Sequence, residues 1–374
     1  MGAGVVNRAG SLAVFFVVLA VAVIGFMLWP EKNSEPAAGG TEPRSGAAVF
    51  SLPVPMTNNA VALATGPDGP TLYSFNGLKA GKGWQDTSQD AFACVIEIKA
   101  CEAISPVPVE QGRLASAAVT VDGKIYLFGG YTVAENGDEV STPEVFAYDT
   151  DDDSYVRVAD MPTPVDDMVA LPYRDRWIYL VSGWHDQGNV SLVQLYDTRT
   201  DSWSQATEFP GLAVFGHAGG LVGNSMIVTD GVAVAGLVDG KRKFVAAPFT
   251  WRGDIDPADP LRISWRPVDP MPGGPLYRMA AVGDPQRKQV IFAGGGDNPY
   301  NYNGIGYDGE PAKPSDRIMG YDLETDSWTA LGRLQSASMD HRGLAKSGQD
   351  YYIMGGMNAD QAVIADVAKF RIDD

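Results

Sequence analysis

The sequence predicts an all-β fold, a six-bladed β-propeller, from three observations. A short apolar run that ends in glycine recurs six times, with its last residue at positions 77, 130, 183, 231, 295 and 356. The octapeptide 196–203 recurs almost unchanged at 321–328, and a looser copy runs from Tyr148 to Tyr155. The chain also contains 43 glycines and 25 prolines, which favours many turns over long helices. A repeat of about 50 residues is typical of propeller blades, each of which packs on its neighbours.

Each apolar run is expected to be one inner strand of a blade. After it come a loop, a strand that ends in Tyr-Asp in the clearest copies, and a turn. A further strand then carries an aromatic residue near its start, as at Trp203 and Trp328. The six runs are Leu72–Gly77, Ile125–Gly130, Ile178–Gly183, Met226–Gly231, Val290–Gly295 and Tyr351–Gly356.

The sixth blade lacks its outermost strand, because Asp374 follows directly on the strand-like segment 365–372. The segment Val49-Phe50-Ser51-Leu52-Pro53 resembles that strand, so we expect it to complete the last blade and close the ring. Closure protects the sheet edges that an open array would leave unpaired. The propeller is therefore predicted to span residues 47–374.

The N-terminal segment predicts export. Residues 12–29 form an uninterrupted apolar stretch preceded by Arg8, which is long enough for a transmembrane signal anchor after a cytoplasmic n-region at 1–11. Residues 30–46, rich in Pro, Gly, Glu and Ser, read as a flexible linker. We expect a single-pass protein of a bacterial inner membrane whose propeller faces the periplasm, or a secreted protein if the apolar segment is cleaved.

Composition excludes some chemistry. The formal charge of −18 argues against nucleic acid as a partner, because phosphate binding needs a basic surface. Cys94 and Cys101 are the only cysteines, and in an oxidising compartment we expect a disulfide between them; two buried thiols are the alternative. Two cysteines and three scattered histidines make no zinc pattern, so no metal and no cofactor is expected.

Polar residues stand just before the first strand of every blade and are expected to form a polar bowl at the channel mouth. Asp166, Asp167, His217 and His341 are candidate acid or base groups, and Arg113, Arg278 and Arg342 are candidate ligand-binding cations. The alternative is that these side chains solvate a water-filled channel and bond backbone carbonyls.

A long loop from Asp297 to Ser315 is expected to open on the same face. Its tyrosines and asparagines combine flat apolar faces with amide groups, which suits sugar rings or peptide backbones. The candidate ligand contacts are Tyr300, Tyr302, Asn303 and Tyr307, with Trp184 and His185 from a neighbouring blade as further walls. A self-packed loop that caps the channel is the alternative. The basic trio 241–243 is either an anchor for a carboxylate or a solvated turn.

The chain resembles the kelch family of β-propellers. The resemblance rests on Gly129-Gly130 after the run 125–128 and on the pairs Tyr196/Trp203 and Tyr321/Trp328. It implies that these aromatic residues pack between blades as core and that His217 occupies a position where kelch repeats often carry a structural histidine.

The run 291–295 with its Asn/Tyr-rich loop is similar to bacterial N-acetylneuraminate epimerase (mutarotase)-like kelch proteins. That likeness implies a bound carbohydrate of the sialic-acid type and mutarotase or epimerase activity. The carboxylate expected after the blade-four glycine is missing, because the chain reads Asp230-Gly231-Val232-Ala233 there. A non-catalytic protein-interaction module of the cell envelope is the alternative. A copper oxidase on a galactose oxidase-like propeller is disfavoured, because both cysteines lie together in blade one.

Overall fold

The computed structural model describes residues 44–238 and 240–373, which belong to one compact unit. The expected n-region and transmembrane anchor, and most of the expected linker, lie outside the described residues. No helix among residues 44–238 and 240–373 has the length and apolar character needed to span a bilayer.

The predicted all-β, six-bladed propeller is confirmed: six sheets follow one another along the chain, each built on four antiparallel strands. Blade one contains β3 (Ala60–Gly66), β4 (Gly69–Leu78), β5 (Thr87–Val95) and β6 (Ala100–Ile104). Blade two contains β7 (Ala117–Val121), β8 (Lys124–Phe128), β11 (Val145–Asp149) and β12 (Ser154–Val158). Blade three contains β13 (Val169–Tyr173), β14 (Trp177–Val181), β17 (Val193–Asp197) and β18 (Ser202–Gln205).

The second half of the chain repeats this order. Blade four contains β19 (Ala218–Val222), β20 (Ser225–Thr229), β23 (Thr250–Asp256) and β24 (Asp259–Val268). Blade five contains β25 (Ala280–Asp284), β26 (Gln289–Ala293), β27 (Ser315–Asp322) and β28 (Ser327–Ser338), with β1 (Arg44–Ser45) added in parallel to β28. Blade six contains β29 (Ala345–Ser347), β30 (Asp350–Met354) and β31 (Asp366–Arg371).

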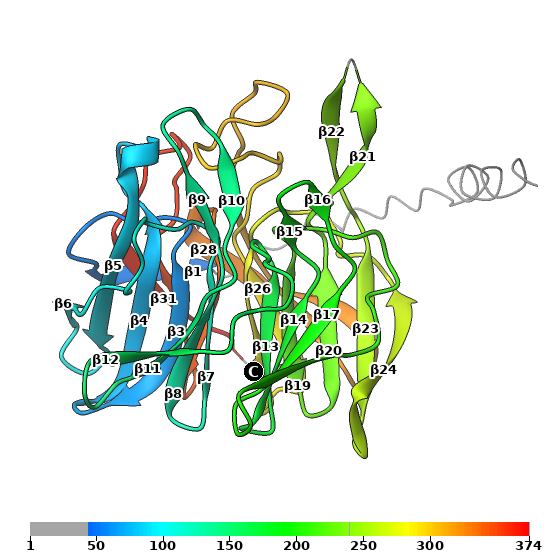
Figure 1. Ribbon diagram of the computed structural model, residues 1–374, viewed down its shortest axis with the longest axis horizontal. Helices are drawn as coiled ribbons and strands as arrows, with labels where there is room; N and C mark the ends of the chain where they lie inside the picture. The colour runs from blue at the N-terminus through cyan, green and yellow to red at the C-terminus, as the bar shows by residue number, and fades with distance from the viewer. Residues whose placement is uncertain (1–43, 239, 374) are drawn as a thin grey trace, which may run out of the picture. The chain divides into compact units, whose positions relative to one another are not determined.

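An N-terminal strand completes blade six. Strand β2 (Ala47–Ser51) pairs antiparallel with β31, from Ala47 opposite Lys369 to Ser51 opposite Asp366. The strand begins and ends two residues earlier than the predicted segment 49–53. Leu52, which follows the strand, is buried in the core. The innermost strands contact one another in the order β3, β7, β13, β19, β25 and β29, and β29 returns to β3. Figure 1 accordingly shows the blue start of the propeller next to its red end.

The repeated octapeptide fixes the outer turn of blades three and five, as the contacts in blade three show. The hydroxyl of Tyr196 donates to Asp201 Oδ1 at 2.7 Å, and Asp201 holds the left-handed turn position with φ 48°. Trp203 Nε1 donates to the carbonyl of Ala159 in the preceding interblade segment at 2.9 Å. Tyr196 is fully buried, with its ring centroid 4.9 Å from that of Trp203. The repeated aromatic residues are therefore core, as the resemblance implied.

A ring of left-handed residues surrounds the central channel just before the innermost strands. One residue per blade has positive φ there: Asn58 (57°), Ala115 (57°), Asp167 (52°), Gly216 (59°), Arg278 (55°) and Asp340 (70°). Hydrogen bonds close the circle, for example from Gly216 N to Asp167 O (2.9 Å) and from Arg278 N to Gly216 O (2.8 Å). Since non-glycine residues seldom adopt this conformation, five of them at one structural position require support from the surrounding fold. The ring holds the polar side chains of the channel mouth.

Short additional elements rise from the connections between the second and third strands of the blades. They are η1 (Trp84–Asp86), β9 (Tyr131–Val133) with β10 (Glu139–Ser141), β15 (Trp184–His185) with β16 (Gly188–Asn189), and β21 (Val232–Val238) with β22 (Lys241–Ala246). Figure 1 shows all of them at one end of the blades. This end is called the loop face below.

Candidate functional site: a polar bowl on the loop face

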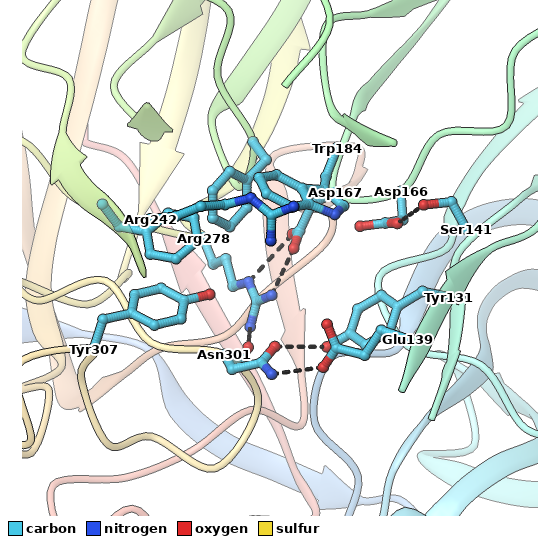
Figure 2. Close-up of a pocket in the computed structure, with 12 residues that line it drawn as sticks. Tyr131, Glu139, Ser141, Asp166, Asp167, Trp184, Arg242, Arg278, Asn301 and Tyr307 are labelled. Carbon is cyan, nitrogen blue, oxygen red and sulfur yellow. Dashed lines mark hydrogen bonds and ion pairs between the residues drawn. The ribbon is translucent and has the colours of Figure 1, made fainter. Parts of the chain in front are cut away.

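A cavity of about 120 Å³ opens on the loop face, and we call it the bowl. Its walls come from three of the loop-face hairpins and the long loop of blade five, and its floor comes from the left-handed ring (Figure 2). The lining residues are Tyr131, Glu139, Ser141, Asp166, Asp167, Trp184, Phe215, Arg242, Phe244, Arg278, Asn301 and Tyr307.

The floor of the bowl is a buried ion pair. Arg278 donates through Nη2 to Asp167 Oδ2 at 2.5 Å and through Nε to Asp167 Oδ1 at 3.2 Å. Its Nη1 donates to Asp340 Oδ1 at 2.9 Å and to the carbonyl of Asn301 at 2.6 Å. Burial alone would raise the pKa of Asp167, but the charges of Arg278 and Arg342 outweigh it and lower that pKa. Both partners of the pair are therefore ionised.

A second arginine holds the same acids from the other side. Arg342 forms an ion pair with Asp167 and donates to Asn58 Oδ1 at 3.0 Å through both Nε and Nη2. Arg342 lines a separate cavity of about 410 Å³ along the innermost strands, together with His217 and His341. The network of Asp167, Arg278, Asp340 and Arg342 thus separates the bowl from this inner cavity.

Two further acids of the bowl have no basic partner among the described residues. Asp166 is 3% exposed and accepts one hydrogen bond, from Ser141 Oγ at 2.6 Å. Burial and the neighbouring charge of Asp167 raise the pKa of Asp166 well above its ordinary value. The carboxylate of Glu139 accepts a hydrogen bond from Asn301 Nδ2 at 2.6 Å. Glu139 lies at the exposed rim of the bowl, and partial desolvation there raises the pKa of its side chain.

Aromatic residues form the opposite wall. The rings of Phe244 and Tyr307 stack with centroids 4.1 Å apart, and the ring of Trp184 lies 5.3 Å from Phe215 and 5.9 Å from Phe244. Arg242 lies over the ring of Trp184 at 5.2 Å and donates to Gln187 Oε1 at 3.0 Å. The bowl thus has an acidic side and an aromatic side.

The structure brings five of the predicted site residues together in the bowl: Asp166, Asp167, Trp184, Arg278 and Tyr307. The two histidine candidates line the inner cavity instead. His217 Nε2 lies 2.9 Å from the carbonyl of Val181, and His341 Nε2 lies 3.0 Å from Ser338 Oγ. Burial lowers the pKa of both histidines to about 4, so both are neutral near pH 7. The predicted single rim is therefore split between two cavities.

Other predicted contacts lie outside the bowl lining. Arg113 is buried in an ion pair with Glu144 at 2.9 Å. Tyr300 is fully buried, with Arg278 over its ring at 5.3 Å. Tyr302 packs beside the cluster that contains Tyr131. The carbonyl of Asn303 accepts a hydrogen bond from Lys82 Nζ. His185 is the cross-strand partner of Gly188 in the β15–β16 hairpin. Arg342 lines the inner cavity on the other side of the floor.

The sequence interpretation missed several residues that line the bowl. Tyr131, Glu139 and Ser141 come from the β9–β10 hairpin, and Phe244 comes from β22. The connection 131–144 is nearly as long as the blade-five loop that was singled out, so its length was an available signal.

A disulfide joins Cys94 to Cys101 across β5 and β6, where the two residues are cross-strand partners. Among the described residues, no group of three His, Cys, Asp or Glu side chains is placed to hold a metal ion.

Residues 112–162 match the Kelch motif. Kelch-like protein 15 of Gallus gallus is 28% identical over 112 residues, which cover 30% of this chain and 22% of that protein. Kelch-like protein 25 of Rattus norvegicus is 23% identical over 304 residues, which cover 71% of this chain and 47% of that protein. The chain thus spans less than half the length of either relative.

The structure of YjhT superposes with a TM-score of 0.69 at 17% identity, over 87% of this chain and 97% of that one. At this identity the superposition shows a shared fold. The chain thus carries a Kelch motif at residues 112–162 within a six-bladed β-propeller fold that it shares with YjhT.

Proposed function

We propose that this protein binds a saccharide in the bowl. The observation that carries the proposal is the combination, in one small cavity, of an aromatic wall with polar groups that retain bonding capacity. Trp184 and Tyr307 offer flat faces for the C–H surface of a pyranose ring, while Asp166, Glu139 and Asn301 accept or donate hydrogen bonds to its hydroxyls. A cavity of about 120 Å³ has room for one sugar ring rather than a long oligosaccharide.

A sugar carboxylate of the sialic-acid type would have to rely on Arg242. The charge of Arg278 is already neutralised by Asp167 and Asp340. Arg242 stands at the aromatic side, where its partners among the described residues are Trp184 and Gln187, both neutral. The expected sialic-acid specificity is therefore the less supported form of the proposal.

Mutarotase or epimerase chemistry on a bound sugar would fall to Asp166 and Glu139. Both have raised pKa values and face the same cavity, as a general acid and a general base require. His217 and His341 lie on the other side of the floor network and would not reach a sugar in the bowl.

The test is a glycan screen by isothermal titration on the full chain, with Trp184→Ala as the site variant. We expect a saccharide with a dissociation constant in the micromolar to millimolar range and a loss of about tenfold or more in the variant, since a sugar-stacking indole contributes more than about 1 kcal/mol. Trp84→Ala is the matched control, because Trp84 lies on the loop face but outside the bowl. A screen without any binder at millimolar concentration would contradict the proposal.

A protein partner on the loop face is the second candidate, and Kelch propellers generally mediate such interactions. Seven of the eleven exposed large hydrophobic side chains in the described residues lie in connections on this face: Trp84, Val140, Leu237, Val238, Phe249, Ile305 and Tyr307. Exposed apolar side chains that gather on one face mark interaction sites. Substituting Leu237 and Val238 with Ser would weaken capture of such a partner without affecting sugar binding.

Display outside the cytoplasm, through a membrane anchor at 12–29, is part of the same proposal. The Cys94–Cys101 disulfide supports it, because disulfides persist in oxidising compartments. Protease accessibility of the propeller in intact cells, before and after outer-membrane permeabilisation, tests this placement.

A further inference from the structure

We propose that the ligand of the bowl carries an ammonium group, which binds between Asp166 and Glu139, so that the favoured substrate class is a sugar with a free amine. This inference rests on the proposed saccharide site and specifies its chemistry.

The first step is the charge balance of the floor. Asp167 and Asp340 are matched by Arg278 and Arg342, and all four side chains are at most 5% exposed. This buried network is neutral as a whole. The charge of Arg278 is therefore neutralised within this network and does not balance a further acid, although Arg278 lines the bowl.

The second step concerns Asp166 and Glu139, the two acids of the bowl outside this network. Asp166 and Glu139 each receive one hydrogen bond from a neutral donor, Ser141 and Asn301 respectively. Asp166 lines the bowl and is only 3% exposed, yet its Oδ1 accepts no hydrogen bond from any described residue; Figure 2 shows the single bond of Asp166 to Ser141. The charge of Glu139 also adds to the raised pKa of Asp166. The bowl thus contains two acids that pair with no cation among the described residues.

The third step is the position of Arg242, the remaining basic residue of the lining. It stacks on Trp184 and is bound to Gln187, at the aromatic side of the bowl. It forms no ion pair with Asp166 or Glu139 in the described structure.

An ammonium group suits these two unpaired acids better than the other ligand types. It supplies three donors and a positive charge, which stabilise the ionised form of both acids through charge-assisted hydrogen bonds. A neutral sugar brings no charge that offsets the two acids, and an anionic sugar adds a negative charge beside them. No set of three metal-ligating side chains is present among the described residues, so a metal ion has too few protein ligands here.

The experiment compares four probes on the full chain by isothermal titration at pH 7.5. The probes are the methyl glycosides of 2-amino-2-deoxyglucose, N-acetylglucosamine, glucose and glucuronic acid, with the galacto-configured set in parallel. We expect the free amine to bind at least about tenfold more tightly than its N-acetyl counterpart, since a charge-assisted hydrogen bond is stronger than a neutral one. Lowering the pH to 5 should weaken binding of the amine alone, because a larger fraction of Asp166 and Glu139, whose pKa values are raised by burial, is then protonated and uncharged.

Variants identify the acids. Asp166→Asn and Glu139→Gln should each reduce the preference for the amine by about tenfold and leave weak binding of the neutral glycoside. Glu135→Gln, in the same hairpin connection, and Asp152→Asn are the controls, since both residues are exposed and lie outside the bowl.

The outcomes separate the two proposals. Equal or tighter binding of the neutral or anionic glycosides would overturn the ammonium inference and leave the saccharide site standing. Absence of binding by every probe would contradict both.

Discussion

Arg278 and Asp167 form a buried bidentate ion pair across the channel mouth, with Nη2 2.5 Å from Oδ2 and Nε 3.2 Å from Oδ1. The two residues come from blades three and five, 111 positions apart, and both occupy the left-handed ring. Their pairing closes the bowl underneath and ties blades three and five together.

Replacing Arg278 with Met should destabilise the fold strongly. The substitution leaves Asp167 and Asp340 as buried acids with one cation fewer, and breaking a buried pair in this way costs about 3–5 kcal/mol. Urea unfolding followed by tryptophan fluorescence measures the loss. Arg262→Met is the control, because the Arg262 side chain is 77% exposed. A loss below about 1 kcal/mol for Arg278→Met would show that the pair does not support the fold.

Tyr196→Phe tests the role of the octapeptide. The change removes only the hydroxyl that donates to Asp201 Oδ1, so we expect a loss of about 1 kcal/mol in the free energy of unfolding. The sugar affinity should stay unchanged, since Tyr196 lies outside the bowl lining. A stability equal to that of the natural chain would mean that solvent replaces this bond at no cost.

Asp230 predicts a specific pH dependence of stability. Burial raises its pKa to about 7, while Leu276 N donates to its Oδ2 at 2.8 Å. Because the folded state holds this proton more tightly than the unfolded state, stability from Asp230 is fully present below about pH 4 and is lost as the pH rises through about 7.

Asp230→Asn should remove that dependence. Asparagine keeps an acceptor for Leu276 N and tolerates the φ of 60°, and it cannot ionise. We expect the variant to exceed the natural chain in stability by about 1–3 kcal/mol at pH 8 and by much less at pH 5. Thermal unfolding of both proteins across this pH range checks it, and parallel pH profiles would contradict the assignment.

Removal of residues 47–51 should open the ring. Strand β31 would keep β30 but lose its outer antiparallel partner β2, and would expose a free edge next to blade one. We expect a lower melting temperature and concentration-dependent aggregation, measured by light scattering during a thermal ramp. Unchanged stability and solubility would show that β2 is dispensable for closure.

The sequence predicted the architecture well because the repeat carries packing information. The glycine-terminated runs identified six blades, and Tyr196 and Trp203 were correctly interpreted as core. The missing strand of blade six led to β2, within two residues of its observed bounds. Each of these features is local and recurs, so one copy supports another.

The bowl was only half predictable for the opposite reason. Side chains just before the innermost strands lie on either side of the left-handed ring. Arg278 lines the bowl, whereas Arg342 and His341 line the inner cavity. Which cavity a side chain lines depends on its direction and on the ion pairs that Asp167 forms with Arg278 and Arg342. The sequence next to these residues indicates neither the direction nor the ion pairs. Glu139 and Phe244 enter from hairpins that occur once each, and nothing in the repeat marks them.

The most direct test of the bowl as the ligand site is a crystal structure of the protein soaked with the amine-bearing methyl glycoside at saturating concentration. Our account predicts the sugar ring against Trp184 and Tyr307, with its nitrogen within about 3 Å of Asp166 and Glu139 carboxylate oxygens. An empty bowl at saturation, or a sugar bound elsewhere on the propeller, would contradict it.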